Sequence, residues 1–173
     1  MARSKRTTKD KLLDAAEKLF ARRGFHGTSL REITCDAGVG LALVAYHFGG
    51  KKPLFAAVLE RRGAMLNDER LRRLADVRRA AAPQPASTEA VIGAFFDPIL
   101  DFLAHAGPGW HSYFTLLAWV NNSPEWGREL MSKTFNDTVR EFIRALMESL
   151  PGAAPEDVFW GYNFLTGALT LSL

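Results

Sequence analysis

Hydrophobic residues recur every three or four positions along almost the whole chain, and no stretch shows the strict alternation of a half-buried strand. In the first such segment, residues 9–23, the apolar side chains form one stripe: Leu12, Leu13, Ala16, Leu19 and Phe20. Gly24 follows as a left-handed stop. The pattern predicts a helix over 9–23 and an all-α chain.

Two short helices are expected next. Ser29 with Glu32 three residues later has the signature of a capping box, so a second helix is predicted from there to about Ala37. Gly38 ends it after barely two turns, and a third helix is predicted over 41–48. Two short helices joined by a glycine-containing turn form a helix-turn-helix, which lets the second helix lie in the major groove of DNA.

Longer helices are expected in the remainder, at about 53–80, 88–106, 110–122, 124–150 and from 155 to the end. Between the first two of these, the segment 81–88 is rich in proline and serine and is the expected linker. We therefore predict an N-terminal three-helix DNA-binding domain over residues 1–52. A larger helical domain is predicted over 53–173.

Charge divides the chain in the same way. Residues 1–62 carry 13 Lys and Arg against 6 Asp and Glu, a net of +7, whereas the remainder carries 9 against 13, a net of −4. Clustered basic residues suit a polyanion, because neutralising phosphates releases counterions. The alternative is that this basic face is only a solvated surface.

Little in the chain suggests catalysis or a cofactor. The patterns G-x-S-x-G, P-loop and HExxH are all missing, and His105 and His111 lack the cysteine or carboxylate company of a metal site. The single cysteine, Cys35, excludes an internal disulfide and is read as a small apolar filler rather than a redox group. A single cysteine fits a reducing compartment, and residues 1–11 lack the apolar segment of a secretory signal. A cytoplasmic location is therefore expected.

The N-terminal pattern resembles that of one family in detail. The run GFHGTSLREITCDAGVGLALVAYHFGGKKPLFAAVL, preceded by AAEKLFARR, is similar to the DNA-binding domain of TetR-family bacterial regulators over about residues 9–59. The resemblance implies a homodimer whose N-terminal domains occupy successive major grooves of an operator. It also implies a helical domain that encloses a small-molecule effector, which usually releases the DNA, so that a repressor is expected.

We assign the DNA contacts to helices two and three and to the start of helix four. Phosphate contacts are expected at Lys51, beside a helix N-terminus where amide dipoles favour anions, and at six further residues: Thr28, Tyr46, His47, Arg3, Lys5 and Arg6. For the arm residues 3–6 the alternative is a disordered solubilising tail.

Base reading is expected from Arg31, the best bidentate guanine reader, because the third helix has few hydrogen-bonding groups. Its groove-facing positions are small or apolar where relatives often carry polar residues: Gly40, Leu41, Leu43 and Ala45. Ala42 and Leu43 offer only contact with a thymine methyl. Specificity is then expected to lean on Arg31, Tyr46 and DNA shape. The alternative for Arg31 is a surface ion pair with Glu32 or Asp36.

The second domain holds most of the aromatic residues, and most of these are expected to form the core. Six apolar side chains are predicted to line a pocket for a largely apolar effector: Phe95, Ile99, Phe102, Tyr113, Leu117 and Phe164. His111, Asn121 and Asn163 are candidate polar groups for orienting it.

From Val158 to Leu173 the chain has no charged residue, and apolar side chains surround the expected helix. The segment is too short and too interrupted by glycine for a membrane span, so one face is expected to meet a partner subunit through Phe159, Tyr162 and Leu169. The pattern stops at Leu173 without a cap, so the natural chain is expected to extend further. The competing function is a helical ligand-binding or interaction protein without sequence-specific DNA binding.

Overall fold

A computed structural model describes residues 7–121 and 127–172, and every regular element in these ranges is an α-helix. In chain order the helices are α1 (Thr8–Arg23), α2 (Leu30–Ala37), α3 (Ala42–Phe48), α4 (Lys51–Ala81), α5 (Thr88–His105), α6 (Pro108–Asn121), α7 (Gly127–Ser149) and α8 (Pro155–Ser172). The all-α prediction is confirmed. The predicted boundary near residues 122–124 lies outside the described residues.

Local chemistry explains the ends of the short helices. The predicted capping box is present at the start of α2, where the Ser29 hydroxyl accepts the Glu32 N–H and the Glu32 carboxylate accepts the Ser29 N–H. Gly38 closes α2 in the left-handed conformation at φ 64°, which glycine adopts without steric cost. The turn then leads into α3, which begins at Ala42, one residue later than predicted.

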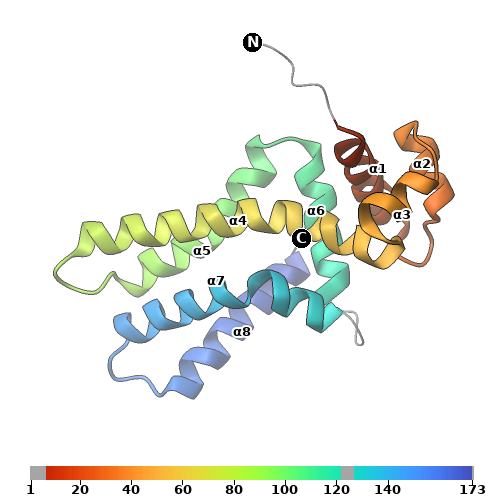
Figure 1. Cartoon of the computed structure of the whole chain (residues 1–173). Helices are drawn as coiled ribbons and strands as arrows, with labels where there is room; N and C mark the ends of the chain where they lie inside the picture. The colour runs from red at the N-terminus through yellow and green to blue at the C-terminus, as the bar shows by residue number, and fades with distance from the viewer. Residues whose placement is uncertain (1–6, 122–126, 173) are drawn as a thin grey trace, which may run out of the picture.

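Helices α1, α2 and α3 gather at one end of the molecule around the start of α4 (Figure 1). Each contributes a side chain with no solvent exposure to the shared core: Leu12 from α1, Ile33 from α2, Val44 from α3 and Leu54 from α4. These four side chains hold the two short helices against the longer ones. The outer faces of α2 and α3 therefore have fixed orientations.

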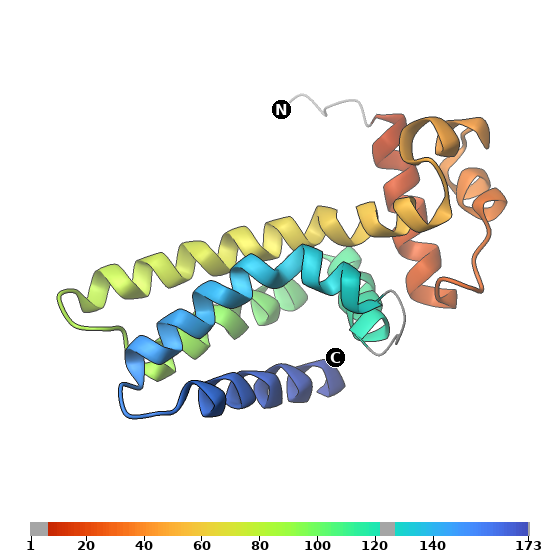
Figure 2. The ribbon, with the colours of Figure 1, turned by 60° about the horizontal axis from the view of Figure 1, so that its bottom comes forward.

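The long helix α4 runs from this end into the second group of helices, α5 to α8 (Figures 1 and 2). The same hydrophobic cluster that holds α1, α2 and α3 continues through Phe55 and Val58 of α4 to Tyr113 and Phe114 of α6. The predicted division after residue 52 thus falls within the first turn of α4 and remains a prediction.

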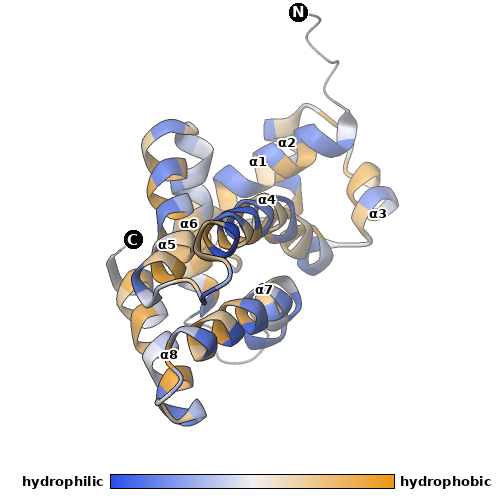
Figure 3. Cartoon of the chain, turned by 90° about the vertical axis from the view of Figure 1, so that its left-hand side faces the viewer, coloured by the Kyte–Doolittle hydropathy of each residue, from blue (hydrophilic) through white to orange (hydrophobic). Residues whose placement is uncertain are grey.

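Helix α8 lies at the periphery, alongside α7 (Figure 2). Hydrophobic residues continue along α8 where it faces outward, away from the other helices (Figure 3). The inner face packs through Val158, which is buried in a second cluster with Leu74, Phe95 and Phe142. No helix among the described residues is both long and apolar enough to cross a membrane.

Candidate functional site

The α2–turn–α3 unit presents an open face built from both helices. Four predicted contact residues are exposed there: Leu41, Ala42, Ala45 and Tyr46. The Tyr46 side chain is 81% exposed, and its ring lies 4.9 Å from that of His47, measured between centroids. His47 and Leu43 are half-buried. Only Val44 of α3 is fully buried, so most of the helix surface remains available to a partner.

Arg31 stands on α2 with its side chain exposed. Its two acidic neighbours form ion pairs with basic residues of α1: Glu32 pairs with Arg23, and Asp36 pairs with Lys18 at 3.1 Å. Hydrogen bonds from Ser29 lower the pKa of Glu32, so this carboxylate stays ionised in its cap. Within the described residues Arg31 makes no ion pair, which leaves its guanidinium available for a ligand.

Lys51 is the first residue of α4, and Gly50 before it offers no side-chain cap. Pro53 has no N–H, and the Leu54 N–H donates to the Gly50 carbonyl oxygen. The N–H groups of Lys51 and Lys52 are therefore the ones that can bind an anion at this end. The Lys51 Nζ atom lies 4.5 Å from the centroid of the Phe25 ring, which holds the ammonium at the end of α4. The site combines a helix N-terminus with a positioned cation, as phosphate binding requires.

Thr28 differs from its expected role. Its side chain is buried, and its hydroxyl donates to the carbonyl oxygens of Leu19 at 3.2 Å and Gly24 at 3.0 Å. The hydroxyl ties the loop before α2 to the end of α1 and is buried rather than presented on the surface. The arm residues Arg3, Lys5 and Arg6 lie outside the described residues.

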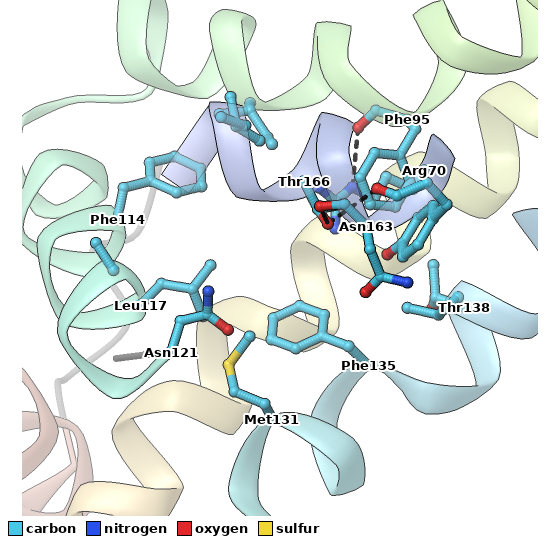
Figure 4. Close-up of a pocket in the computed structure, with 15 residues that line it drawn as sticks. Arg70, Phe95, Phe114, Leu117, Asn121, Met131, Phe135, Thr138, Asn163 and Thr166 are labelled. Carbon is cyan, nitrogen blue, oxygen red and sulfur yellow. Dashed lines mark hydrogen bonds between the residues drawn. The ribbon is translucent and has the colours of Figure 1, made fainter. Parts of the chain in front are cut away.

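A cavity of about 220 Å³ lies between α4, α5, α6, α7 and α8 (Figure 4). Three of the predicted lining residues are there: Phe95, Ile99 and Leu117. Asn121 and Asn163, two of the three expected orienting groups, also line it, whereas His111 does not. The remaining walls come from residues that were not predicted to line this cavity: Arg70, Phe114, Ala118, Met131, Phe135, Thr138, Val139, Tyr162, Thr166 and Leu169.

The structure does not bring the other three predicted lining residues to this cavity. Phe102 stacks on the Trp110 ring with centroids 4.0 Å apart, and Tyr113 is fully buried in the main core. Phe164 is 72% exposed. Its neighbours Tyr162 and Leu169, expected at the dimer interface, instead line the cavity, while Phe159 remains on the outer side.

Helical geometry explains which residues of α8 line the cavity and which face outward. Successive residues turn by about 100°, so Tyr162, Thr166 and Leu169 share the inward face, and Trp160 and Phe164 share the outward face. Because the segment is apolar on every side, its sequence contains no signal for which stripe is buried. The pair Phe164 and Tyr162 was therefore assigned to the wrong faces.

Arg70 is the cavity residue that sequence reasoning missed. It is only 5% exposed, its Nε donates to the Phe95 carbonyl oxygen at 2.9 Å, and its guanidinium carbon lies 3.7 Å from the Phe95 ring centroid. Burial lowers the pKa of Arg70 to about 10, so it remains charged at neutral pH. Burial also raises the pKa of Tyr162, in the same wall, to about 12, which keeps that hydroxyl protonated.

Known proteins show related sequences in both parts of the chain. The transcriptional repressor NicS of Pseudomonas putida is 34% identical over 84 residues, covering 49% of this chain and 38% of NicS. The transcriptional activator FasR of Mycolicibacterium smegmatis is 31% identical over 103 residues, covering 60% of this chain and 43% of FasR. The matches thus span less than half the length of these curated relatives.

The fold agrees with the sequence matches. The fatty acid degradation regulator FadR of Bacillus halodurans superimposes with a TM-score of 0.70 at 16% identity, covering 97% of this chain and 83% of that one. Residues 12–58 match the family described as "Bacterial regulatory proteins, tetR family", and residues 93–173 match the "Tetracyclin repressor-like, C-terminal domain". The chain belongs to the TetR family of bacterial transcriptional regulators.

Proposed function

We propose that this protein is a homodimeric regulator that binds an operator through α2, α3 and the start of α4, and that a small molecule in the cavity alters this binding. The observation that carries the proposal is the open α2–α3 face, which holds Arg31, free of ion pairs with the described residues, and lies beside Lys51 at a helix N-terminus without a side-chain cap. Such a face offers groups for both base edges and phosphates.

The division of labour on this face follows from the side chains. Lys51 and His47 would bind phosphates, whereas the exposed side chains of Arg31 and Tyr46 would contact the bases. Leu41, Ala42, Leu43 and Ala45 offer only apolar contact, so hydrogen-bond readout is concentrated in few residues. Sequence-dependent DNA shape would then supply part of the specificity.

The outer face of α8 supports dimerisation. Phe159, Trp160, Phe164 and Leu165 are all exposed on this peripheral helix, an apolar stripe that a second copy would cover. Phe164→Glu should therefore lower the molar mass seen by light scattering to that of a monomer and weaken operator binding. Met65→Glu, an equally drastic change at an exposed apolar residue of α4, should leave the dimer intact. A dimeric Phe164→Glu protein would place the interface elsewhere.

The decisive experiment is to sequence the genomic DNA fragments that the purified protein retains, and then to measure binding to the enriched site and to random DNA. Arg31→Ala should cost about 1–3 kcal/mol on the enriched site and little on random DNA. Arg140→Ala, which removes an exposed charge on α7, should change neither. Failure to enrich any sequence would overturn the proposed operator binding.

Helix α3 has few side chains that can form hydrogen bonds. This observation supports one competing function, a helical ligand-binding or interaction protein without sequence-specific DNA binding. Salt dependence separates the two. For a DNA-binding face, Lys51→Ala should reduce the slope of log affinity against log salt by roughly 0.9. An unchanged slope together with no sequence preference would favour the interaction protein. Because one relative is named a repressor and another an activator, the direction of regulation must be measured with a reporter gene.

A further inference from the structure

Arg70 lies on the inward-facing stripe of α4, between buried leucines. On α4 it lies four residues after Leu66 and four before Leu74, both of which are fully or almost fully buried. The guanidinium is therefore part of the inward stripe of the helix and borders the cavity. A buried charge is costly unless another group compensates it.

Glu69, which is adjacent to Arg70 in the chain, and Asp101 of α5 are engaged by other arginines, and Asp68 is exposed. Glu69 accepts hydrogen bonds from Arg72 and Arg73, and Asp101 of α5 pairs with Arg73. Within the described residues, no carboxylate bonds to Arg70, whose single hydrogen bond uses only one of five N–H donors. A charged guanidinium at the cavity wall thus lacks an anionic partner.

The cavity has a polar end and a largely apolar end. Figure 4 shows Arg70, Thr138, Asn163 and Thr166 gathered on one side of the cavity. The opposite side is formed mainly by Phe114, Leu117 and Met131, with Asn121 at its edge, and Phe135 lies between the two ends. A ligand that fits both ends must be amphipathic.

We propose that the cavity binds an organic carboxylate whose acid group pairs with Arg70 and whose apolar body extends toward Phe114, Leu117 and Met131. The inference rests on the proposed function, because it identifies the chemical class of the effector expected in that cavity. A planar guanidinium binds a carboxylate through parallel hydrogen bonds, and desolvation at a buried wall strengthens this pairing relative to water. At about 220 Å³ the cavity lies below the usual range for ligand pockets, which favours a small acid.

The test uses the full chain without DNA and probes that differ only in the head group. Isothermal titration calorimetry would compare octanoate with octan-1-ol and octylamine, and phenylbutyrate with phenylbutanol. We expect each acid to bind at least about tenfold more tightly than its alcohol, and octylamine to bind most weakly. Equal affinity for acids and alcohols, or no binding of either acid, would overturn the proposal.

Variants locate the recognition at Arg70. Arg70→Met keeps an unbranched apolar stem without the guanidinium and should remove the preference for acid over alcohol, while the affinity for octan-1-ol stays within about twofold. Arg72→Met removes the same charge from an exposed residue of the same helix and should leave the preference intact. Retention of the preference in Arg70→Met would contradict the assignment.

A second variant avoids changing the core. Asn163 is exposed at the cavity rim, and Asn163→Asp would place a carboxylate near the polar end, where it repels an acid and provides Arg70 with a partner. Octanoate binding should fall at least about tenfold, with little change for octan-1-ol. An Asn163→Asp protein that still prefers the acids would also count against the proposal.

Failure of this inference differs from failure of the proposed function. If octan-1-ol binds as well as octanoate and weakens operator binding, the protein is a regulator with an uncharged effector. If octanoate binds through Arg70 but leaves operator affinity unchanged, the acid site stands and ligand-responsive regulation fails.

Discussion

Helix α4 contains inward-facing arginines in two contrasting settings, half-buried near its start and buried roughly 12 Å further along its axis. Near its start, Arg61 and Arg62 both donate to Glu17 of α1, at 2.9 and 2.7 Å, and Arg61 also donates to Asp14 at 2.8 Å. Two turns later, Arg70 is more deeply buried, at 5% exposed, but no carboxylate among the described residues bonds to it. Arginine side chains of α4 therefore form ion pairs with α1 in one setting and lack a described carboxylate partner in the other.

The two settings also shift the pKa in opposite directions. Burial opposes the charge of Arg61, but hydrogen bonds to Glu17 and Asp14 outweigh it and raise the pKa. Burial alone dominates at Arg70 and lowers its pKa. A buried cation with built-in partners joins helices, whereas one without a partner is prepared for an external anion.

The paired setting joins the two parts of the fold. Glu17 belongs to α1, beside the α2–α3 unit, and Arg62 lies over the Trp110 ring of α6 with its guanidinium carbon 5.0 Å from the centroid. Further along α6, Trp119 packs beside Gly24 at the end of α1. The Glu17 cluster, comprising Asp14, Glu17, Arg61 and Arg62, thus stabilises the orientation of α1 relative to α4 and α6.

The largest expected effect is at the centre of the Glu17 cluster. Glu17→Gln removes the shared carboxylate and leaves two arginines with weaker partners in a buried setting, so the free energy of unfolding should fall by about 3 kcal/mol. Urea denaturation of the purified protein measures this change.

The matched control is Glu60→Gln, which removes an exposed carboxylate whose only described ion pair is with Lys133. Its effect should stay within about 0.5 kcal/mol. A loss below about 1 kcal/mol for Glu17→Gln would show that the cluster is not the joint described above.

A smaller effect is expected where α6 approaches the Glu17 cluster. A Cβ atom at Gly109 would lie 2.1 Å from the Arg62 Nη2 and 3.1 Å from the Glu17 Oε1. Gly109→Ala should displace the Arg62 side chain and destabilise the protein by about 1–2 kcal/mol, as measured by urea denaturation. Gly152→Ala, at a position with open space around it, serves as the control. Equal stability of the two variants would mean that Arg62 moves aside without cost.

The unpaired setting should respond in the opposite way. Arg70→Met replaces a buried charge that no described carboxylate compensates with a shorter, apolar side chain, so in the absence of ligand the free energy of unfolding should rise or change by less than about 1 kcal/mol. Added octanoate should raise the midpoint of thermal unfolding for the wild type but not for this variant. A loss comparable with that of Glu17→Gln would show that Arg70 has a structural role like Arg61 and Arg62.

Sequence reasoning worked where the chemistry is local. The capping box of Ser29 and Glu32 and the stop at Gly38 involve residues within ten positions, so their pattern alone located α2 and the turn. Thr28 shows the limit, because its hydroxyl bonds to Leu19, nine residues earlier, and only the packed fold reveals that it is buried.

The faces of α8 and the role of Arg70 depend on contacts between distant elements. The sequence of a uniformly apolar helix does not indicate which face is buried. Phe164 was therefore predicted in the cavity and Tyr162 at the dimer interface, whereas in the structure Phe164 is exposed and Tyr162 lines the cavity. Arg70 stands in a stretch containing several other arginines and was not singled out from the sequence. A signal was present, since Arg70 falls on the spacing of Leu66 and Leu74, and a charge in an apolar stripe calls for an explanation.

The smallest expected effect concerns Glu69, the carboxylate adjacent to Arg70 in sequence but bonded to Arg72 and Arg73. Hydrogen bonds from these two arginines lower the pKa of Glu69 from 4.5 to about 2. A carboxyl with a lowered pKa in the folded state stabilises the protein above the pKa of the unfolded chain and loses this contribution as pH falls through the folded value. Because these ion pairs are partly exposed, the free energy of unfolding of the wild type should exceed that of Glu69→Gln by only about 0.5 kcal/mol at pH 7.

This difference should shrink between about pH 4.5 and pH 2, where the wild-type carboxyl becomes protonated and the two proteins become alike. Urea denaturation across this range measures it, and Asp68→Asn, which removes an exposed carboxylate one position earlier, provides the control. If Glu69 instead turned toward Arg70 in solution, its removal would leave a buried cation bare and cost several times more. The size of the Glu69→Gln effect therefore decides whether Arg70 is free to receive an external acid or already has an internal one.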